Sequence, residues 1–289
     1  MIKASDKPTK SNGVTAAVVL LLSLSVLTGA GCARGDGGKV VNVSGSTTVL
    51  PVVTAAGEEY QSRHPDIKIG VQGGGSSAGI EAVITGASDI GTSSRDLKDE
   101  ETTKGLFETI IAIDAIAIIV NPANPISGLT QGQVQDIFSG KVLNWREVGG
   151  KDVPIVLVNR DEASGTREAF LKIAMDGVDF SKNAVIQPGT GQVRSIVGST
   201  PGAIGYISHG YLTSDVKAVR YKGVVPTKAN VVNGKYKLQR NLYFFTKGKP
   251  AGETKKFIDF VLGDWVQENI VSKEFVQAGK KPTEPTGEN

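Results

Sequence analysis

The sequence predicts an α/β protein with two lobes that are joined by a two-strand hinge. Apolar strand-like segments alternate with helix-like segments, which is typical of sheets covered by helices. Several of these strands run into a turn of glycine and hydroxyl side chains before the next helix. Two crossings between lobes are expected, near residues 120 and 205. The 289 residues suffice for one large domain or two of ordinary size.

The N-terminus predicts export. Three lysines precede the apolar run Val14–Leu27, and Gly29-Ala30-Gly31 precedes Cys32, the only cysteine. This order of charge, apolar run and small residues is that of a secretory signal. It looks like a bacterial lipoprotein signal with a lipid on Cys32, although Gly29 stands where leucine is usual. The alternative is an ordinary signal with an incidental cysteine. We assign residues 1–32 to the signal and expect the chain in the cell envelope, periplasmic or lipid-anchored at the outer membrane face.

Composition excludes some function classes. A formal net charge of +3 and 6% aromatic residues are lower than is typical of a nucleic-acid-binding protein. The sequence lacks the G-x-x-x-x-G-K-[ST] string of a P-loop and any clustered metal-ligand pattern. We therefore expect neither a metal nor a cofactor.

The first lobe begins with three copies of one pattern, in which a strand is followed by a hydroxyl-rich turn and a helix. The first two strands are predicted at residues 39–44 and 67–72, and a looser third copy covers residues 87–95. The turns contain Ser46, Thr47 and Thr48, then Ser76 in Gly73–Gly79, then Ser94 and Arg95 at the start of a charged helix through residues 98–101. A helix N-terminus presents unpaired N–H groups, so these turns suit an anion.

The apolar run Ile110–Val120 predicts central strands of a sheet covered on both faces. Residues 121–125 then form an extended crossover, and residues 129–148 are predicted as helix and loop with Trp145 in the core.

A second half of the predicted anion site, on the other lobe, begins where the strand 153–158 ends. Arg160 follows it, and Ser164-Gly165-Thr166 opens a helix marked by Phe170 and Ile173. Hydroxyls at the cap and a guanidinium would complete a socket for a tetrahedral oxyanion. The simpler interpretation is a capped helix with a surface arginine. Residues 189–192 are a further candidate turn before a helix.

The chain is predicted to return to the first lobe through a strand that ends near residue 207. A strand in residues 235–246 and a helix over residues 254–268 follow, and the tail from residue 279 is expected to be loose. The predicted buried face of the helix is Phe257, Phe260, Val261 and Trp265. The first lobe would contain residues 33–120 and 206–289, and the second residues 121–205.

Five motifs occur in an order that resembles the phosphate-binding proteins of high-affinity phosphate ABC importers. They are Gly45-Ser46-Thr47-Thr48-Val49-Leu50-Pro51, Gly75-Ser76-Ser77-Ala78-Gly79, Ser93-Ser94-Arg95, Arg160 with Ser164-Gly165-Thr166, and Thr200-Pro201-Gly202-Ala203-Ile204-Gly205-Tyr206. The resemblance covers residues 39–275. It implies the type II periplasmic-binding-protein fold, whose two lobes close over phosphate.

The resemblance also implies roles for residues and partners. The phosphate-binding residues would be Ser46, Thr47, Thr48, Ser76, Ser94, Arg95, Arg160, Ser164, Gly165 and Thr166. Glu162 would orient Arg160. The chain would be a non-catalytic monomer that delivers inorganic phosphate to an ABC permease and its ATPase subunits.

Ser94 is a departure from the family pattern, because the best-known branch has an aspartate there. That aspartate accepts a hydrogen bond from protonated phosphate and rejects sulfate, whereas a hydroxyl can donate or accept. Asp161 or Asp96 could accept the proton instead, and a receptor for a sulfate-like oxyanion is a second possible function.

Two further hypotheses assign the chain to different classes of protein. Gly75–Gly79 fits G-x-S-x-G, so Ser77 could be the nucleophile of a serine hydrolase, with His209 as the only downstream histidine. The same fold could also serve adhesion or signalling, since fold does not determine function.

Overall fold

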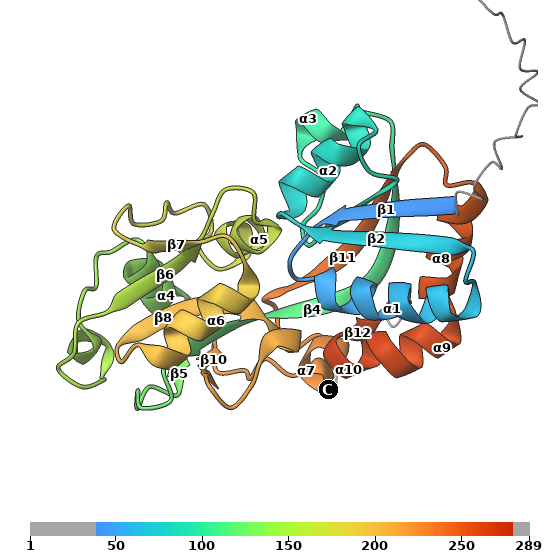
Figure 1. Cartoon of the computed structure of the whole chain (residues 1–289). Coiled ribbons are helices and arrows are strands. Elements are labelled where there is room, and N and C mark those ends of the chain that lie inside the picture. The colour runs from blue at the N-terminus through green and yellow to red at the C-terminus, as the bar shows by residue number, and fades with distance from the viewer. Residues whose placement is uncertain (1–38, 280–289) are drawn as a thin grey trace, which may run out of the picture. The chain divides into compact units, whose positions relative to one another are not determined.

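The computed structural model describes residues 39–279, which lie in one compact unit. Its main sheet has ten strands, eight of them in the order β2-β1-β3-β11-β4-β8-β6-β7 (Figure 1). The predicted signal with Cys32, and the tail beyond residue 279, lie outside the described residues. None of the described helices is long and apolar enough to span a bilayer.

The first group of elements follows the predicted pattern. Strands β1 (Lys39–Gly45), β2 (Ile67–Gly73) and β3 (Ile90–Ser93) are parallel, and Gly45 pairs with both Gly73 and Thr92. The carboxyl ends of these strands therefore meet at one edge. The helices that follow them are α1 (Leu50–Arg63), α2 (Ser76–Thr85) and α3 (Asp99–Thr102).

One long strand connects the two groups of elements. Strand β4 (Leu106–Val120) pairs with β11 (Gln239–Lys247) up to Ala115, and with β8 (Ala203–Ser208) from Ile116 onward. The predicted apolar run is thus a single strand whose partner changes in the middle. Because β4 is buried there on both sides, an almost unbroken apolar sequence is required.

The second group is built on β6 (Val156–Arg160), which lies parallel to β8 and to β7 (Val185–Gln187). Its helices are α4 (Gln131–Phe138), α5 (Gly165–Ile173) and α6 (Thr190–Ser199). Trp145 is buried as predicted, and its indole N–H donates to the Gly202 carbonyl at 2.8 Å. The rings of Phe170 and Tyr206 stack with centroids 4.1 Å apart.

Short elements complete the chain. They are β5 (Gly128–Leu129), the 3-10 turns Trp145–Val148 and His209–Tyr211, β9 (Lys217–Ala218), β10 (Arg220–Tyr221), α7 (Lys228–Val232), α8 (Gly252–Leu262), α9 (Asp264–Val266), a π-helical turn Gln267–Val271, α10 (Ser272–Glu274) and β12 (Val276–Gln277).

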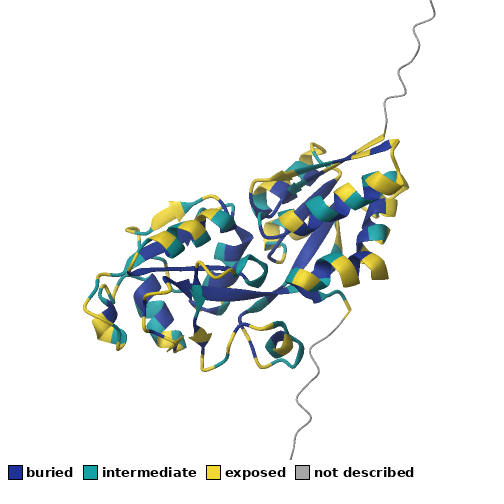
Figure 2. Cartoon of the chain, turned by 60° about the horizontal axis from the view of Figure 1, so that its bottom comes forward, coloured by how far each residue is buried: buried dark blue, intermediate teal, exposed yellow. Residues whose placement is uncertain are grey.

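The two largest apolar cores lie on either side of the midpoint of β4. One core joins α1 and α8 to β1, β2 and β11, and the other joins α4 and α5 to β6 and β8. In Figure 2 the central strands are dark blue, whereas the outer faces of the helices are yellow. The lobe boundaries stay a prediction. The packing of five residues into the second core favours assigning their segment to the second lobe: Val219, Tyr221, Val231, Tyr236 and Leu238.

Two details of the predicted elements were wrong. The helix over residues 254–268 stops at Leu262, because Gly263 takes an extended conformation with φ −68° and ψ 150°. Trp265 therefore turns outward and is 42% exposed, with the Arg63 guanidinium 4.4 Å from its ring centroid. Helix α3 begins at Asp99, so Ser94 and Arg95 lie in the preceding loop and not at its start.

Candidate functional site

The hydroxyl-rich turns gather at the carboxyl ends of parallel strands, where ligands bind in open α/β sheets. From the first lobe, Ser46, Thr48 and Ser76 are buried. The turns are tied together, since the Gly75 N–H donates to the Gly45 carbonyl at 2.9 Å and the Ser94 N–H donates to Ser76 Oγ at 3.0 Å. The edge of the first lobe is therefore a single ordered surface of hydroxyls.

The second lobe meets this surface directly. Thr48 Oγ1 lies 3.2 Å from Thr166 Oγ1, and Thr47 Oγ1 lies 3.2 Å from Thr190 Oγ1. Gly165 is so close to the first lobe that a Cβ on it would lie 2.3 Å from Ser76 Oγ. The structure thus brings together predicted hydroxyl residues of both lobes, and Gly165 with them.

Helix N-termini surround this place. The N-termini of α1, α2 and α6 have no side-chain cap, which leaves N–H donors available. Helix α5 is capped as predicted, because Ser164 Oγ accepts from the Arg167 N–H at 3.2 Å. Aligned helix dipoles make such a place electropositive without any large net charge.

Arg160 lies at the end of β6 with only 2% of its surface exposed. It donates from Nε to the Gln187 carbonyl at 3.1 Å, from Nη2 to the Pro188 carbonyl at 2.9 Å and from Nη1 to Thr190 Oγ1 at 3.2 Å. Within residues 39–279 no carboxylate forms an ion pair with it. Burial lowers the pKa of Arg160, the nearby charge of Asp161 opposes this shift, and the charge of Arg240 adds to it. A bound anion would relieve this buried positive charge.

Arg95 is placed differently from the expectation. Its guanidinium contacts Glu101 at 2.7 Å and 2.8 Å, Glu168 at 3.0 Å and Ser77 Oγ at 3.1 Å. Burial alone would lower its pKa, but the hydrogen bond to Glu101 and the charge of Glu168 outweigh burial and raise it. Since its donors are directed to carboxylates, the geometry favours Arg95 as a link between the lobes over a contact with a ligand.

The acidic residues considered for the site differ in their exposure and in their hydrogen-bond partners. Glu162 is exposed, so Arg160 is oriented by the carbonyls of β7 and its following turn instead. The Asp96 side chain is 64% exposed, accepts a hydrogen bond from the Tyr243 hydroxyl and forms an ion pair with Lys172. In contrast, Asp161 Oδ1 is buried and has no hydrogen-bond partner among the described residues.

The hydrolase arrangement is not formed. The Ser77 hydroxyl accepts from Arg95, whereas His209 Nδ1 lies 3.4 Å from the Glu274 carbonyl. Three or more potential metal ligands do not cluster anywhere in residues 39–279. The groups that do converge here, hydroxyls, backbone N–H and a guanidinium held only by neutral oxygens, are suited to binding an anion.

Sequence reasoning missed two buried residues beside the site, Arg240 and Asp114, and it placed Thr190 in the candidate turn of residues 189–192 without giving it a role. Arg240 on β11 donates to Thr48 Oγ1 at 3.2 Å and to Asp114 at 2.9 Å, and Thr190 contacts both Arg160 and Thr47. Asp114 could have been found, since it is the only charged residue in the apolar run Ile110–Val120 and a buried carboxylate needs a partner. The pairing with Arg240, 126 positions away, is not visible in the sequence.

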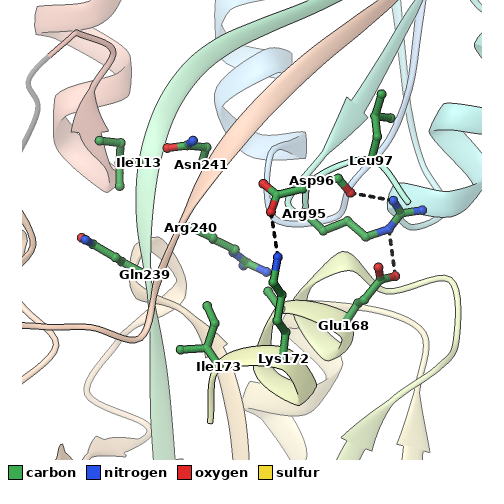
Figure 3. Close-up of a pocket in the computed structure, with 11 residues that line it drawn as sticks. Arg95, Asp96, Leu97, Ile113, Glu168, Lys172, Ile173, Gln239, Arg240 and Asn241 are labelled. Atoms are coloured by element: carbon green, nitrogen blue, oxygen red, sulfur yellow. Dashed lines mark hydrogen bonds and ion pairs between the residues drawn. The ribbon is translucent and has the colours of Figure 1, made fainter. Parts of the chain in front are cut away.

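A cavity of about 350 Å³ adjoins these residues, between α5, β11 and the loop after β3. Figure 3 shows Glu168 directed toward Arg95 and Lys172 directed toward Asp96 across this space. Its walls are thus held by ion pairs from both lobes.

Comparison with known proteins agrees with this geometry. The family model described as a PBP superfamily domain matches residues 28–264. The phosphate-binding protein PstS of Bacillus subtilis is 37% identical over 237 residues, which is 81% of this chain and 79% of the relative. The chain belongs to the phosphate-binding proteins of the PBP superfamily.

Solved structures agree with this family assignment. A putative phosphate ABC transporter substrate-binding protein from Clostridium perfringens, solved with bound phosphate, is 41% identical with a TM-score of 0.80, covering 83% of this chain and 99% of its own. An ABC-type phosphate transport receptor from Vibrio cholerae is 33% identical with a TM-score of 0.70, covering 82% and 99%. The fold is therefore the two-lobed type II periplasmic-binding-protein fold.

Proposed function

We propose that this chain is an exported receptor that captures inorganic phosphate between its lobes and delivers it to an ABC importer. The observation that carries the proposal is Arg160, a buried guanidinium that has no carboxylate partner among the described residues. It donates to Thr190 Oγ1, which in turn lies 3.2 Å from Thr47 Oγ1 of the first lobe. Relatives of this family are named for phosphate binding, and one similar structure contains phosphate.

In this proposal the site divides its work between charge and neutral donors. Arg160 supplies positive charge, and the turns supply hydroxyl and N–H donors: Ser46, Thr47, Thr48, Ser76, Ser94, Ser164, Gly165 and Thr166. Charge-assisted hydrogen bonds are about twice as strong as neutral ones, so Arg160 contributes most per contact. Arg95 acts from outside this set, through Glu168.

We further propose that the two lobes move about the point where β4 changes partner. Closure would bring Thr48 against Thr166 and remove water from the anion, which strengthens each electrostatic contact. The chain would then dock on a membrane permease with ATPase subunits. A lipid on Cys32 would hold it, as a monomer, at the outer face of the membrane.

A sulfate-like oxyanion is the second candidate ligand, because Ser94 offers a hydroxyl where the best-known branch has an aspartate. Asp161 supports phosphate instead, since its buried Oδ1 is free to accept a proton-bearing oxygen. At neutral pH phosphate carries a proton and sulfate does not. A carboxylate that accepts this proton therefore favours phosphate over sulfate.

Replacing Arg160 tests the proposal. Losing one partner of a buried charge contact costs about 2–5 kcal/mol, so Arg160→Ala should weaken phosphate binding by roughly 30-fold to several thousandfold. Calorimetric titration of the ligand-stripped chain with phosphate and sulfate measures this.

Arg146 provides the control, since it is exposed and pairs with Asp152, so Arg146→Ala should bind like the unchanged chain. If the unchanged chain binds no phosphate, the proposed function is wrong. If Arg160→Ala binds as well as the unchanged chain, the site assignment is wrong.

A further inference from the structure

A buried hydrogen-bond chain leads from the middle of the sheet to the site. Ser208 Oγ on β8 donates to Asp114 Oδ1 on β4 at 2.8 Å. Arg240 on β11 donates to Asp114 Oδ2 from Nη2 at 2.9 Å and from Nε at 3.2 Å. The same Nη2 donates to Thr48 Oγ1 at 3.2 Å. Three strands therefore converge, through Arg240, on one hydroxyl of the cleft.

The direction of these hydrogen bonds is determined by chemistry. A guanidinium has donors and no acceptor, so Thr48 Oγ1 must accept from Arg240. The hydroxyl proton of Thr48 is then directed elsewhere, and the other polar atom in contact is Thr166 Oγ1, at 3.2 Å across the cleft. Arg240 thus makes Thr48 a donor toward the place where the lobes meet.

The second threonine pair has the same construction. Arg160 Nη1 donates to Thr190 Oγ1, which lies 3.2 Å from Thr47 Oγ1 of the other lobe. Each threonine pair across the cleft therefore has one arginine behind it. The two arginines differ in charge balance, since Asp114 neutralises Arg240 whereas Arg160 has no ion-pair partner among the described residues.

We propose that Arg240 is a positioning residue, held by Asp114, that orients the Thr48 hydroxyl as a hydrogen-bond donor to the bound anion. The inference rests on the proposed phosphate site and deepens it. Arg240 adds little net charge, because its side chain and that of Asp114 are 4% and 0% exposed and paired at 2.9 Å. Figure 3 shows its side chain extending from β11 toward α5.

The test is a double-mutant cycle of Arg240→Lys and Thr48→Val. A lysine keeps a positive charge near Asp114, but its ammonium lacks the planar fork that spans Asp114 and Thr48. Each single variant should weaken phosphate binding about tenfold in calorimetry. The double variant should bind within about twofold of Thr48→Val, because Arg240 acts through that hydroxyl. Additive losses would overturn the inference.

Further variants separate positioning from a merely structural role. Thr48→Ser keeps the hydroxyl and should retain phosphate affinity within about threefold, whereas a packing role would not be rescued. If Arg240→Lys fails to fold, the paired change Arg240→Gln with Asp114→Asn, which removes both charges together, replaces it in the same cycle with the same expectation. Arg63→Lys, a surface arginine of α1 paired with Glu59, is the matched control and should bind normally.

The two failures can be told apart. If the unchanged chain does not bind phosphate, the proposed function fails, whatever the cycle gives. If it binds phosphate and Arg240→Lys has no effect, only the inference about Arg240 is wrong.

Discussion

At the scale of single residues, the two buried arginines beside the site differ in the charge of the groups that surround them. Arg160 and Arg240 are both buried guanidiniums, yet Arg240 has the carboxylate of Asp114, whereas the described partners of Arg160 are carbonyl and hydroxyl oxygens. Neutral acceptors orient a guanidinium without cancelling its charge. An unpaired buried charge is costly, so its presence is explained best by a ligand of opposite sign.

The proposed acceptor of the phosphate proton is also a single residue, Asp161. Asp161→Asn should reduce the preference for phosphate over sulfate by roughly tenfold, because an amide can donate to the oxygen that a carboxylate would repel. The ratio of the two affinities in calorimetry measures this. Asp96→Asn serves as the comparison: its side chain is directed to Tyr243 and Lys172, so the ratio should stay unchanged. The opposite pattern would make Asp96 the acceptor.

Among the elements, the start of helix α5 lies directly against the first lobe. Its first residue, Gly165, lies against Ser76, and the carbonyl of Ala163, two residues earlier, accepts from the Ser77 N–H at 3.2 Å. Gly75 has φ +95°, and a Cβ there would lie 2.6 Å from the Ala163 carbonyl. Glycine is therefore needed at both helix starts for the backbones to approach.

Gly165→Ala separates helix stability from binding. Alanine favours a helix over glycine by ~1 kcal/mol, so thermal unfolding of the ligand-free chain should be unchanged or slightly higher. Overpacking costs about 1–3 kcal/mol, so phosphate affinity should fall roughly 5- to 150-fold as the Cβ meets Ser76. Gly132→Ala in α4 is the control, because a Cβ there meets no atom within 4 Å. Equal phosphate affinity of both variants would contradict the assignment.

At the scale of the whole molecule, ion pairs join the lobes beside the site. Glu168 on α5 contacts Arg95 at 3.0 Å and Lys98 at 3.7 Å, and Lys172 contacts Asp96 at 3.3 Å. Partly exposed pairs contribute about 0.2–1 kcal/mol each and weaken with salt. In the proposed closure of the lobes, these pairs would therefore adjust the balance between open and closed forms without creating the site.

Removing Glu168 should show this adjustment. Glu168→Gln should weaken phosphate binding about two- to fivefold at low salt, since two pairs across the lobes are lost. The difference from the unchanged chain should shrink at roughly 0.5 M salt, where the Debye length is on the order of 4 Å. Glu59→Gln removes a pair within α1 alone and should have no effect on phosphate binding. A loss from Glu168→Gln that does not depend on salt would contradict this role.

Local pattern was enough for the repeated strand, turn and helix, and for the hydroxyl side chains that meet in the site. These features depend on neighbours along the chain: Ser164 caps α5 through the N–H of Arg167, and the Gly45–Thr48 turn follows directly from β1. The family order of five motifs predicted the fold and the function for the same reason, because each motif is a short continuous segment.

Only the tertiary structure decided how distant side chains pair. Arg95 was expected at the ligand, yet its guanidinium is held by two carboxylates, Glu101 of its own lobe and Glu168 of the other lobe. Arg240 was not singled out in the sequence, yet it donates to Thr48 Oγ1 and to Asp114, which is 126 positions from Arg240 in the chain. The position of a charge in a pattern indicates that a partner is needed, but a buried guanidinium is directed by the carboxylate that the fold brings nearest.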